Sequence, residues 1–270
     1  MKPSPLHHAH DESVYGGKAA SLARSLQAGL PVPPGFALGT EHVEAVADGH
    51  LELLSNLRAA FAGLAGPCAV RSSAVGEDSE GASFAGQHVT ILNVRHEDHV
   101  ADAVLKVRDS ARTESARAYR RTMGMDETPR VGVVVQRMID PDCAGVLFTK
   151  NPLNGANERV VEAAWGLGEA VVSGIVVPDH YVLDELGRVT KRLPGEKDVA
   201  LRSSAEGGTV EESVPDDRIS ALCLSDDMLA GLHGLAARCE AFFGSGLDIE
   251  WAFADGTLYL LQCRAMTRNR

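Results

Sequence analysis

The sequence lacks an excess of positive charge, and it lacks any long apolar run. Its 270 residues carry a formal net charge of -11, which argues against nucleic acid or an anionic membrane as the main partner, because both require a positive field. No apolar stretch approaches the ~20 residues that span a bilayer, and the N-terminus lacks the apolar segment of a signal peptide. We therefore predict a cytoplasmic protein with no nucleic-acid or membrane partner.

Cysteine spacings typical of metal sites or disulfide frameworks are also missing. The chain has 5 cysteines, an odd number, and no two of them stand in a CxxC pair. A zinc site or a disulfide framework is therefore not expected, and a reducing compartment is favoured. A hydrophobic content of 44% over this length is sufficient for a substantial core in one large domain or two small ones.

A complete phosphate-binding P-loop is absent as well. Gly16-Gly17-Lys18 resembles the end of that motif, but its first glycine would fall at Glu12, and Ala19 replaces the required Ser or Thr. This loop can still present backbone N–H groups and an ammonium to a phosphate. A flexible turn with a surface lysine is the alternative interpretation.

What the sequence does contain is a mixture of helical and strand patterns, which predicts an α+β protein with two lobes. The segment 195–214 is polar, and we predict that it is mobile. Helices are predicted over 18–30, 41–64 (in pieces, interrupted by Gly49), 98–123 and 226–243, and strands over 36–38, 68–71, 88–94, 131–136, 145–148, 159–164, 180–184 and 188–193.

The C-terminal hairpin has the clearest strand pattern. Apolar residues alternate with polar or small ones over 248–253, as in a strand with one buried face. A three-residue loop at 254–256 would place Glu250 and Gln262 on one face, whereas a two-residue turn at 255–256 would place them on opposite faces. We predict the three-residue loop, because it brings together two oxygen ligands suited to Mg²⁺. A cross-strand hydrogen bond is the alternative role of the pair.

Two further polar residues stand in apolar surroundings. Arg71 ends an apolar strand pattern, where an arginine is costly unless an anion meets it. A salt bridge to Glu77 or Asp78 is the alternative. Gln136 follows three valines and could bind the edge of an adenine through its amide, although an ordinary strand end explains it equally well.

Taken together, these residues resemble the N-terminal nucleotide-binding domain of the dikinase family, which includes phosphoenolpyruvate synthase, pyruvate phosphate dikinase and rifampin phosphotransferase. The matching segments follow the family order over almost the whole chain. They are Gly16-Gly17-Lys18-Ala19-Ala20-Ser21-Leu22, Gly29-Leu30-Pro31-Val32-Pro33-Pro34-Gly35-Phe36, Val70-Arg71-Ser72-Ser73-Ala74, Ala82-Ser83-Phe84-Ala85-Gly86-Gln87, Val134-Val135-Gln136-Arg137-Met138, Gly145-Val146-Leu147-Phe148-Thr149, Glu162-Ala163-Ala164-Trp165-Gly166-Leu167-Gly168-Glu169, Asp248-Ile249-Glu250-Trp251-Ala252 and Leu261-Gln262-Cys263-Arg264.

This resemblance implies an ATP-grasp fold, with ATP held between an N-terminal lobe (1–125) and a C-terminal lobe (126–270). By the same resemblance, Lys18, Arg71 and Arg264 contact phosphates and are the predicted catalytic residues. Gly86 and Thr90 belong to the loop that covers the phosphates.

The resemblance also implies the remaining nucleotide and metal contacts. Gln136 and the backbone near Met138 correspond to the hinge that binds adenine, while Glu250 and Gln262 correspond to the Mg²⁺ ligands. The predicted cofactors are therefore ATP and Mg²⁺. Phosphoryl transfer depends mainly on positioning and charge neutralisation, which such groups supply.

In this family the domain cleaves ATP to AMP and phosphate, passing the β-phosphoryl group to a histidine on a swivelling domain. None of the ten histidines here has the glycine-rich surroundings of that domain. The sequence departs from the family pattern at Lys150 and Ala265, and the interval from Lys18 to Arg71 is short. The leading hypothesis is an ATP-binding component that works on a phosphohistidine protein in trans; a fragment of a longer protein would look the same. The alternatives are a stand-alone ATP-grasp enzyme acting on a small molecule and a non-catalytic ATP-binding module.

Overall fold

The computed structural model describes residues 1–76, 89–122 and 129–266. Helices and antiparallel sheets are mixed in it, which confirms the predicted α+β class. The residues group into two units, and each is described by itself. In the described part of the chain, no helix has the length and apolar character needed to cross a membrane. Unit 1 comprises Met1–Gln27, Pro33–Met138 and Ser204–Gly208, and unit 2 comprises Ala28–Val32, Ile139–Ser203 and Thr209–Arg270.

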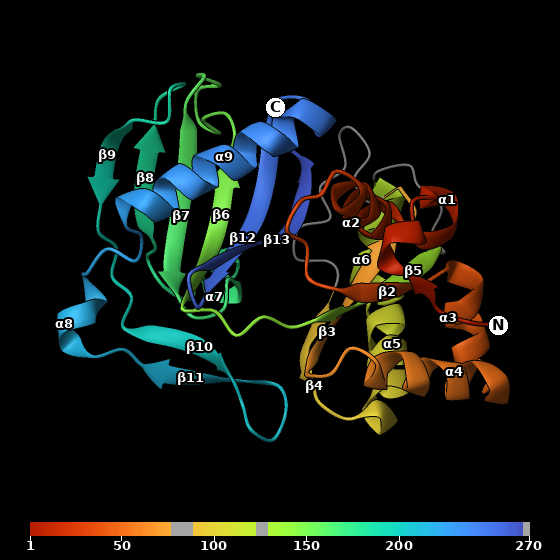
Figure 1. Cartoon of the computed structure of the whole chain (residues 1–270). Helices are drawn as coiled ribbons and strands as arrows, with labels where there is room; N and C mark the ends of the chain where they lie inside the picture. Colours follow the sequence, from red (N-terminus) through yellow and green to blue (C-terminus); the bar gives the residue numbers. More distant parts are fainter. Residues whose placement is uncertain (77–88, 123–128, 267–270) are drawn as a thin grey trace. The chain divides into compact units, whose positions relative to one another are not determined.

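Unit 1 is built on a five-stranded sheet of order β1-β2-β5-β3-β4, whose neighbouring strands are all antiparallel (Figure 1). Strand β5 belongs to this unit, although it lies after residue 125. The predicted division into lobes 1–125 and 126–270 stays a prediction. The strands are β1 (Ser4–Pro5), β2 (Gly35–Leu38), β3 (Cys68–Ala74), β4 (Thr90–Val94) and β5 (Val131–Arg137). The helices are η1 (Leu6–His8), α1 (Glu12–Tyr15), α2 (Gly17–Gln27), α3 (Thr40–Ala47), α4 (Leu51–Ala62), η2 (Glu97–His99), α5 (Val100–Ser110) and α6 (Glu114–Thr122).

One face of this sheet packs on α3, α4 and α5, and the other, against which the start of α2 packs, carries the polar residues singled out by the sequence. Val70 on β3 and Val135 on β5 join Leu57 of α4 and Val104 of α5 in the main core of the unit. Since successive side chains of a strand point to opposite faces, Arg71 lies on the face of β3 away from this core.

Two predictions about the helices of unit 1 had different outcomes. The interruption at Gly49 is confirmed, because Gly49 has a φ of 72° between α3 and α4. The single helix predicted over 98–123 is wrong, since α5 ends at Ser110 and α6 begins at Glu114. The Ser110 and Thr113 hydroxyls bond backbone groups at the break, Thr113 accepting the Ala116 N–H at 3.3 Å. Such side chains compete with the helical ladder and favour a new helix start.

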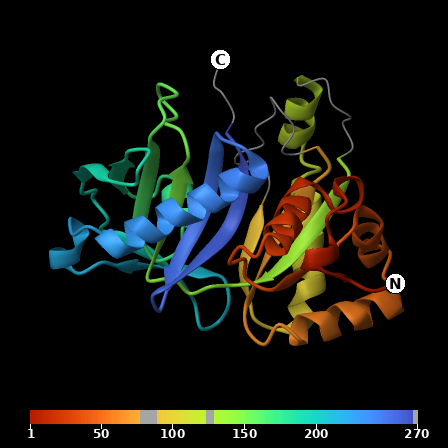
Figure 2. The same ribbon diagram turned by 45° about the horizontal axis from the view of Figure 1, so that its top comes forward.

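Unit 2 is built on a six-stranded sheet of order β13-β12-β6-β7-β8-β9 and a separate ribbon of β10 and β11. Helix α9 lies across the strands of the larger sheet in both views (Figures 1 and 2). The strands are β6 (Cys143–Phe148), β7 (Arg159–Trp165), β8 (Asp179–Leu183), β9 (Val189–Leu193), β10 (Val199–Ser203), β11 (Thr209–Ser213), β12 (Leu247–Ala254) and β13 (Thr257–Ala265). The helices are α7 (Glu169–Val172), α8 (Asp216–Ile219) and α9 (Asp226–Phe243).

Helix α9 begins where the sequence predicts. The Ser225 hydroxyl accepts the Met228 N–H at 3.3 Å, which is an N-cap hydrogen bond. The helix ends at Gly244, whose φ of 83° few other residues adopt without strain. Leu229, Leu232 and other apolar side chains of the helix are buried.

The mobility predicted for 195–214 stays a prediction, but two strands that were not predicted lie in this segment. This segment forms β10 and β11, which pair over Val199–Ser203 and Thr209–Ser213. The side chains of β11 are all exposed, so the apolar alternation that identifies a half-buried strand is missing from its sequence.

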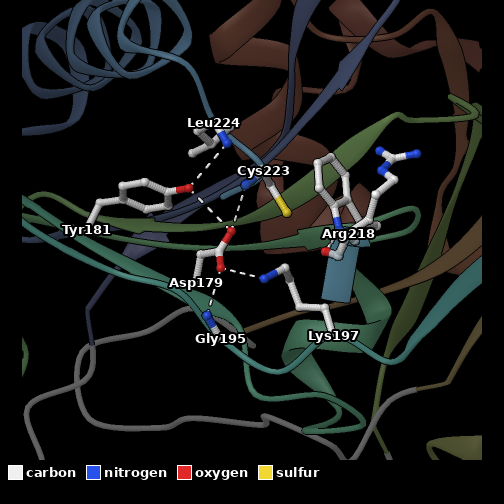
Figure 3. Close-up of polar contacts among 8 residues, drawn as sticks. Asp179, Tyr181, Gly195, Lys197, Arg218, Cys223 and Leu224 are labelled. Carbon is white, nitrogen blue, oxygen red and sulfur yellow. Dashed lines mark hydrogen bonds and ion pairs between the residues drawn. The ribbon is translucent and has the colours of Figure 1, made fainter. Parts of the chain in front are cut away.

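The same segment contributes Lys197, whose side chain is 0% exposed, to a buried polar cluster around Asp179 (Figure 3). The Asp179 carboxylate accepts the Lys197 ammonium at 2.5 Å, and it accepts the backbone N–H groups of Gly195 and Cys223 at 2.8 and 2.7 Å. The Tyr181 hydroxyl donates to it at 3.3 Å, and burial raises the pKa of that phenol, which keeps its proton in place. Asp179 thus joins β8 to two segments distant in sequence.

Because Asp179 and Lys197 are both fully buried, we expect Asp179→Ala to lower the free energy of unfolding by about 3–5 kcal/mol, since it leaves an ammonium without its counter-charge. Urea denaturation measures this change. The control is the double variant Asp179→Leu with Lys197→Met, which removes both charges and should recover part of the loss; the rest reflects the Gly195 and Cys223 N–H groups that lose their acceptor. A single variant as stable as the wild-type protein would contradict a structural role for the ion pair.

Candidate functional site

The hairpin of β12 and β13 turns differently from the prediction. Ala254 pairs with Thr257, so the turn has two residues, and the predicted three-residue loop is wrong. Both turn residues have positive φ, 48° at Asp255 and 72° at Gly256. This is the type I′ geometry for which Asp-Gly is a preferred sequence, because its twist matches that of the flanking strands.

A β-bulge nevertheless brings Glu250 and Gln262 to the same face. Trp251 pairs with Leu260, but the next pair is Glu250 with Gln262, so Leu261 is an extra residue on β13. One extra residue reverses the facing of every side chain beyond it. Glu250 and Gln262 are therefore directly opposite each other, which is closer than the diagonal pairing that the three-residue loop would give.

The adjacent pair on the same face consists of Asp248 and Arg264. They are opposite each other in the register, and the Arg264 guanidinium donates to Asp248 Oδ2 from Nε at 2.9 Å and from Nη2 at 2.8 Å. Burial raises the pKa of Asp248, and the charge of Arg264 opposes that shift. No role was predicted for Asp248, although its position two residues before Glu250 on a strand places both on one face.

These residues lie on the face of the six-stranded sheet opposite α9. Arg159 of β7 donates to the His233 carbonyl at 2.6 Å and to Glu240 at 2.9 Å, both on α9. Glu162 is three residues further along β7 and therefore faces away from α9. Through the register, Glu162 is aligned with Val146 of β6, and Val146 with Glu250 of β12. Glu250 and Gln262 therefore share this face.

His180 of β8 completes the row. It pairs with Glu162, and its Nδ1 lies 3.9 Å from Glu162 Oε1, with side-chain exposures of 32% and 36%. The row across the sheet is therefore Gln262, Glu250, Val146, Glu162 and His180. Neither residue was predicted as a site residue: Glu162 lies in the matching segment 162–169 but received no role, and His180 lies in none of the matching segments.

In unit 1, Lys18 is the second residue of α2 and is largely buried. The turn before it packs against β3: the Ala19 N–H donates to the Ser73 hydroxyl at 2.9 Å. Gly16 has a φ of 82°, and a Cβ there would lie 1.8 Å from the Ser73 carbonyl oxygen. This position therefore requires glycine, and the turn fixes Lys18 at the start of a helix instead of on a flexible loop.

Arg71, Thr90 and Gln136 share one face of the sheet in unit 1. Arg71 pairs with Thr90 across β3 and β4, and its Nη1 donates to Gln136 Oε1 at 3.5 Å. The Gln136 amide nitrogen donates to the Pro33 carbonyl at 3.1 Å. Gln136 is thus anchored beside Arg71. The alternative partners of Arg71 considered above, Glu77 and Asp78, lie outside the described residues, as does Gly86.

Met138 follows β5 and contacts the bulge of β4. Its Sδ accepts the Asn93 N–H at 3.1 Å, and Asn93 has a φ of 55°. The Asn93 amide donates to the Ser204 and Gly208 carbonyls, both at 2.7 Å. A cavity of about 330 Å³ lies beside Asn93 and α5, but none of the predicted site residues lines it.

Residues 50–270 match the sequence family described as pyruvate phosphate dikinase, AMP/ATP-binding domain. A protein named "Probable phosphoenolpyruvate synthase" from Methanothermobacter thermautotrophicus is 34% identical over 95% of this chain and 44% of its own length. The "Prodigiosin synthesizing transferase PigC" of Serratia marcescens is 36% identical over 93% of this chain and 31% of its own length. A "Rifampicin phosphotransferase" from a Streptomyces species is 42% identical over 74% of this chain and 23% of its own length. The chain thus spans less than half of each of these relatives.

Because Asp248 makes two charge-assisted hydrogen bonds to the partly exposed Arg264, we expect Asp248→Ala to lower the free energy of unfolding by about 1–2 kcal/mol. Thermal denaturation measures the loss. The control is Arg188→Ala, which breaks an exposed pair with Asp184 and should cost less than about 0.5 kcal/mol. If the two variants are equally stable, the Asp248–Arg264 pair does not support the hairpin.

Proposed function

Since the chain belongs to the pyruvate phosphate dikinase AMP/ATP-binding domain family, we propose that it is the ATP-using component of a dikinase-type phosphotransferase. In this proposal it cleaves ATP to AMP and phosphate and passes the β-phosphoryl group to a histidine on a separate carrier domain or protein. The observation that carries the proposal is the placement of Glu250, Gln262, Asp248 and Arg264 in two adjacent cross-strand pairs on one sheet face.

The donor set of this face suits Mg²⁺ bound to a nucleotide. Glu250 and Gln262 offer side-chain oxygens from opposite strands, and Mg²⁺ in nucleotide sites uses one or two carboxylates while retaining waters and phosphate oxygens. Among the described residues, no three His, Cys, Asp or Glu side chains form a metal cluster, so a transition-metal centre has no support there. When bound, Mg²⁺ would neutralise charge on the phosphates.

The cations have complementary roles in the proposal. Arg264 is oriented by Asp248, which holds its guanidinium beside the metal pair, where its positive charge suits a phosphate. Lys18 lies in the first turn of α2, where an ammonium and backbone N–H groups attract anions. Arg71 is positioned by Gln136, and a guanidinium held in one orientation suits phosphate oxygens.

The adenine contacts in the proposal come from the end of β5. Gln136 ends the buried part of that strand, and Met138 follows it. Because the Gln136 side chain is bonded to Pro33 and Arg71, we assign it mainly to positioning, with adenine bound by backbone groups near Met138. Thr90, beside Arg71, and Gly86 are assigned to the loop that covers the phosphates.

The carrier histidine is proposed to belong to a partner. The relatives are more than twice as long as the segment that they share with this chain. Their names differ in the product or substrate, which supports a shared ATP-using part combined with different acceptors. The acceptor of this chain is therefore not assigned.

Calorimetric titration with Mg·ATP, followed by chromatography of the nucleotide after incubation, tests the proposal. Binding without turnover by the chain alone is expected, because none of its ten histidines has the glycine-rich surroundings expected of the carrier. Production of ADP, or of AMP and phosphate, by the chain alone would favour an independent enzyme. Absence of binding would favour a non-catalytic module and would contradict the proposal.

Glu250→Ala should abolish Mg²⁺-dependent ATP use and leave the fold intact, because it removes the only charged ligand of the proposed metal pair. Circular dichroism checks the fold, and nucleotide turnover with the carrier partner measures the effect. A matched control is Glu211→Ala on the exposed strand β11, which should behave as the wild-type protein does. Unchanged turnover in Glu250→Ala would remove the metal assignment.

Lys18→Ala should weaken Mg·ATP binding at least tenfold, which corresponds to about 1.4 kcal/mol, because a cation at the phosphates is lost. Isothermal titration calorimetry gives the dissociation constant. Lys106→Ala, which removes an exposed ammonium on α5, serves as the charge-matched control. An unaltered dissociation constant for Lys18→Ala would exclude its phosphate role.

A further inference from the structure

From the row of side chains across the six-stranded sheet, we propose that Glu162 and His180 form a subsite for the ribose hydroxyls of the bound nucleotide. This inference rests on the proposed function, because it assumes that Mg·ATP binds the same face. It adds a specificity role to two residues to which the sequence assigned no contact with the nucleotide. The subsite would distinguish a nucleoside with sugar hydroxyls from one without them.

The position of the pair supports a contact with the ligand. Glu162 lies on the face that carries Glu250 and Gln262, with only Val146 of β6 between Glu162 and Glu250 in the row. Neighbouring strands are 4.7–4.9 Å apart, so the backbones of Glu162 and Glu250 are separated by about 10 Å. Long side chains from both positions can therefore contact different parts of one nucleotide. With the phosphates at the metal pair, the ribose is the next group along the ligand.

The distance within the pair also suits a hydroxyl group. His180 Nδ1 and Glu162 Oε1 are 3.9 Å apart, which is too long for a direct hydrogen bond. A hydroxyl can donate to a carboxylate and accept from an imidazole N–H at the same time. Both side chains are about one-third exposed, so their polar atoms remain accessible from the sheet face.

Charge favours ribose over the other parts of ATP. A phosphate facing Glu162 would bring two negative groups together, which is unfavourable without a cation. A second metal there is not supported, since the described residues contain no three-ligand cluster. The ribose is neutral and offers two hydroxyl donors. Carboxylates bind ribose hydroxyls in the same way in dinucleotide-binding folds.

The test compares Mg·ATP with Mg·2′,3′-dideoxy-ATP by calorimetry. We expect the wild-type protein to bind ATP at least about tenfold more tightly, because a hydrogen bond to a charged group is lost with the hydroxyls. Glu162→Ala should bind both nucleotides equally, with the affinity that the wild-type protein has for the dideoxy analogue. Glu162→Gln, which keeps an acceptor oxygen but not the charge, should show intermediate discrimination, as should His180→Ala.

Controls separate a ribose contact from a structural effect. Glu185→Ala, which removes an exposed carboxylate in the turn between β8 and β9, should retain full discrimination. If Glu162 has a purely structural role, Glu162→Ala would weaken the binding of both nucleotides by the same factor. The ratio of the two dissociation constants would then be preserved, and that result would overturn the inference. Equal binding of both nucleotides by the wild-type protein would overturn it as well. If the wild-type protein binds neither nucleotide, the proposed function fails and the ribose subsite fails with it.

Discussion

The bulge at Leu261 is the constraint on which the candidate site depends. The Asp-Gly turn fixes a two-residue connection, and a regular ladder from that turn would point Glu250 and Gln262 to opposite faces. One extra residue reverses the facing of β13 and aligns two pairs, Glu250 with Gln262 and Asp248 with Arg264. Bulges commonly re-aim side chains in this way near functional sites. The hairpin thus combines the turn that its sequence prefers with the facing that its polar residues require.

The rest of unit 2 supports that hairpin by separating two kinds of surface. The α9 side of the sheet is mainly apolar apart from Arg159, with Ile249 and Trp251 fully buried, and burial of such side chains contributes roughly 1.5–3 kcal/mol each. The other side carries the carboxylates, the amide, the guanidinium and the imidazole. Burial on one face therefore fixes the register, and the register fixes which polar groups are neighbours. The buried Asp179 cluster then joins β8 to the segments around Lys197 and Cys223.

The sequence predicted best those features that depend on residues close together in the chain. The α+β class, the break at Gly49 and the Ser225 cap depend on glycine, on capping side chains and on periodicity, and all three were predicted correctly. The turn was predicted wrongly because a preference for bringing two ligands together outweighed the stronger turn preference of Asp-Gly. The ribbon over 195–214 was missed because an exposed strand has no apolar alternation.

The candidate site was predictable only in part, and for a similar reason. Glu250 and Gln262 were predicted as metal ligands, but their direct pairing depends on a bulge that no residue type in the hairpin predicts. Glu162 and His180 become neighbours only through strand order, since β7 and β8 are separated by α7 in sequence. Pairings between strands distant in sequence depend on sheet topology, which single-sequence patterns constrain weakly.

The most direct test of the account replaces Mg²⁺ by Mn²⁺ and follows the electron paramagnetic resonance signal of the free ion during titration with the protein. If Glu250 and Gln262 hold the metal of a metal–nucleotide complex, the protein should remove little free Mn²⁺ alone. It should remove stoichiometric Mn²⁺ when ATP is present at a concentration that by itself leaves most of the ion free, and the Glu250→Ala variant should not. Equal metal binding with and without ATP, or by both proteins, would contradict the account.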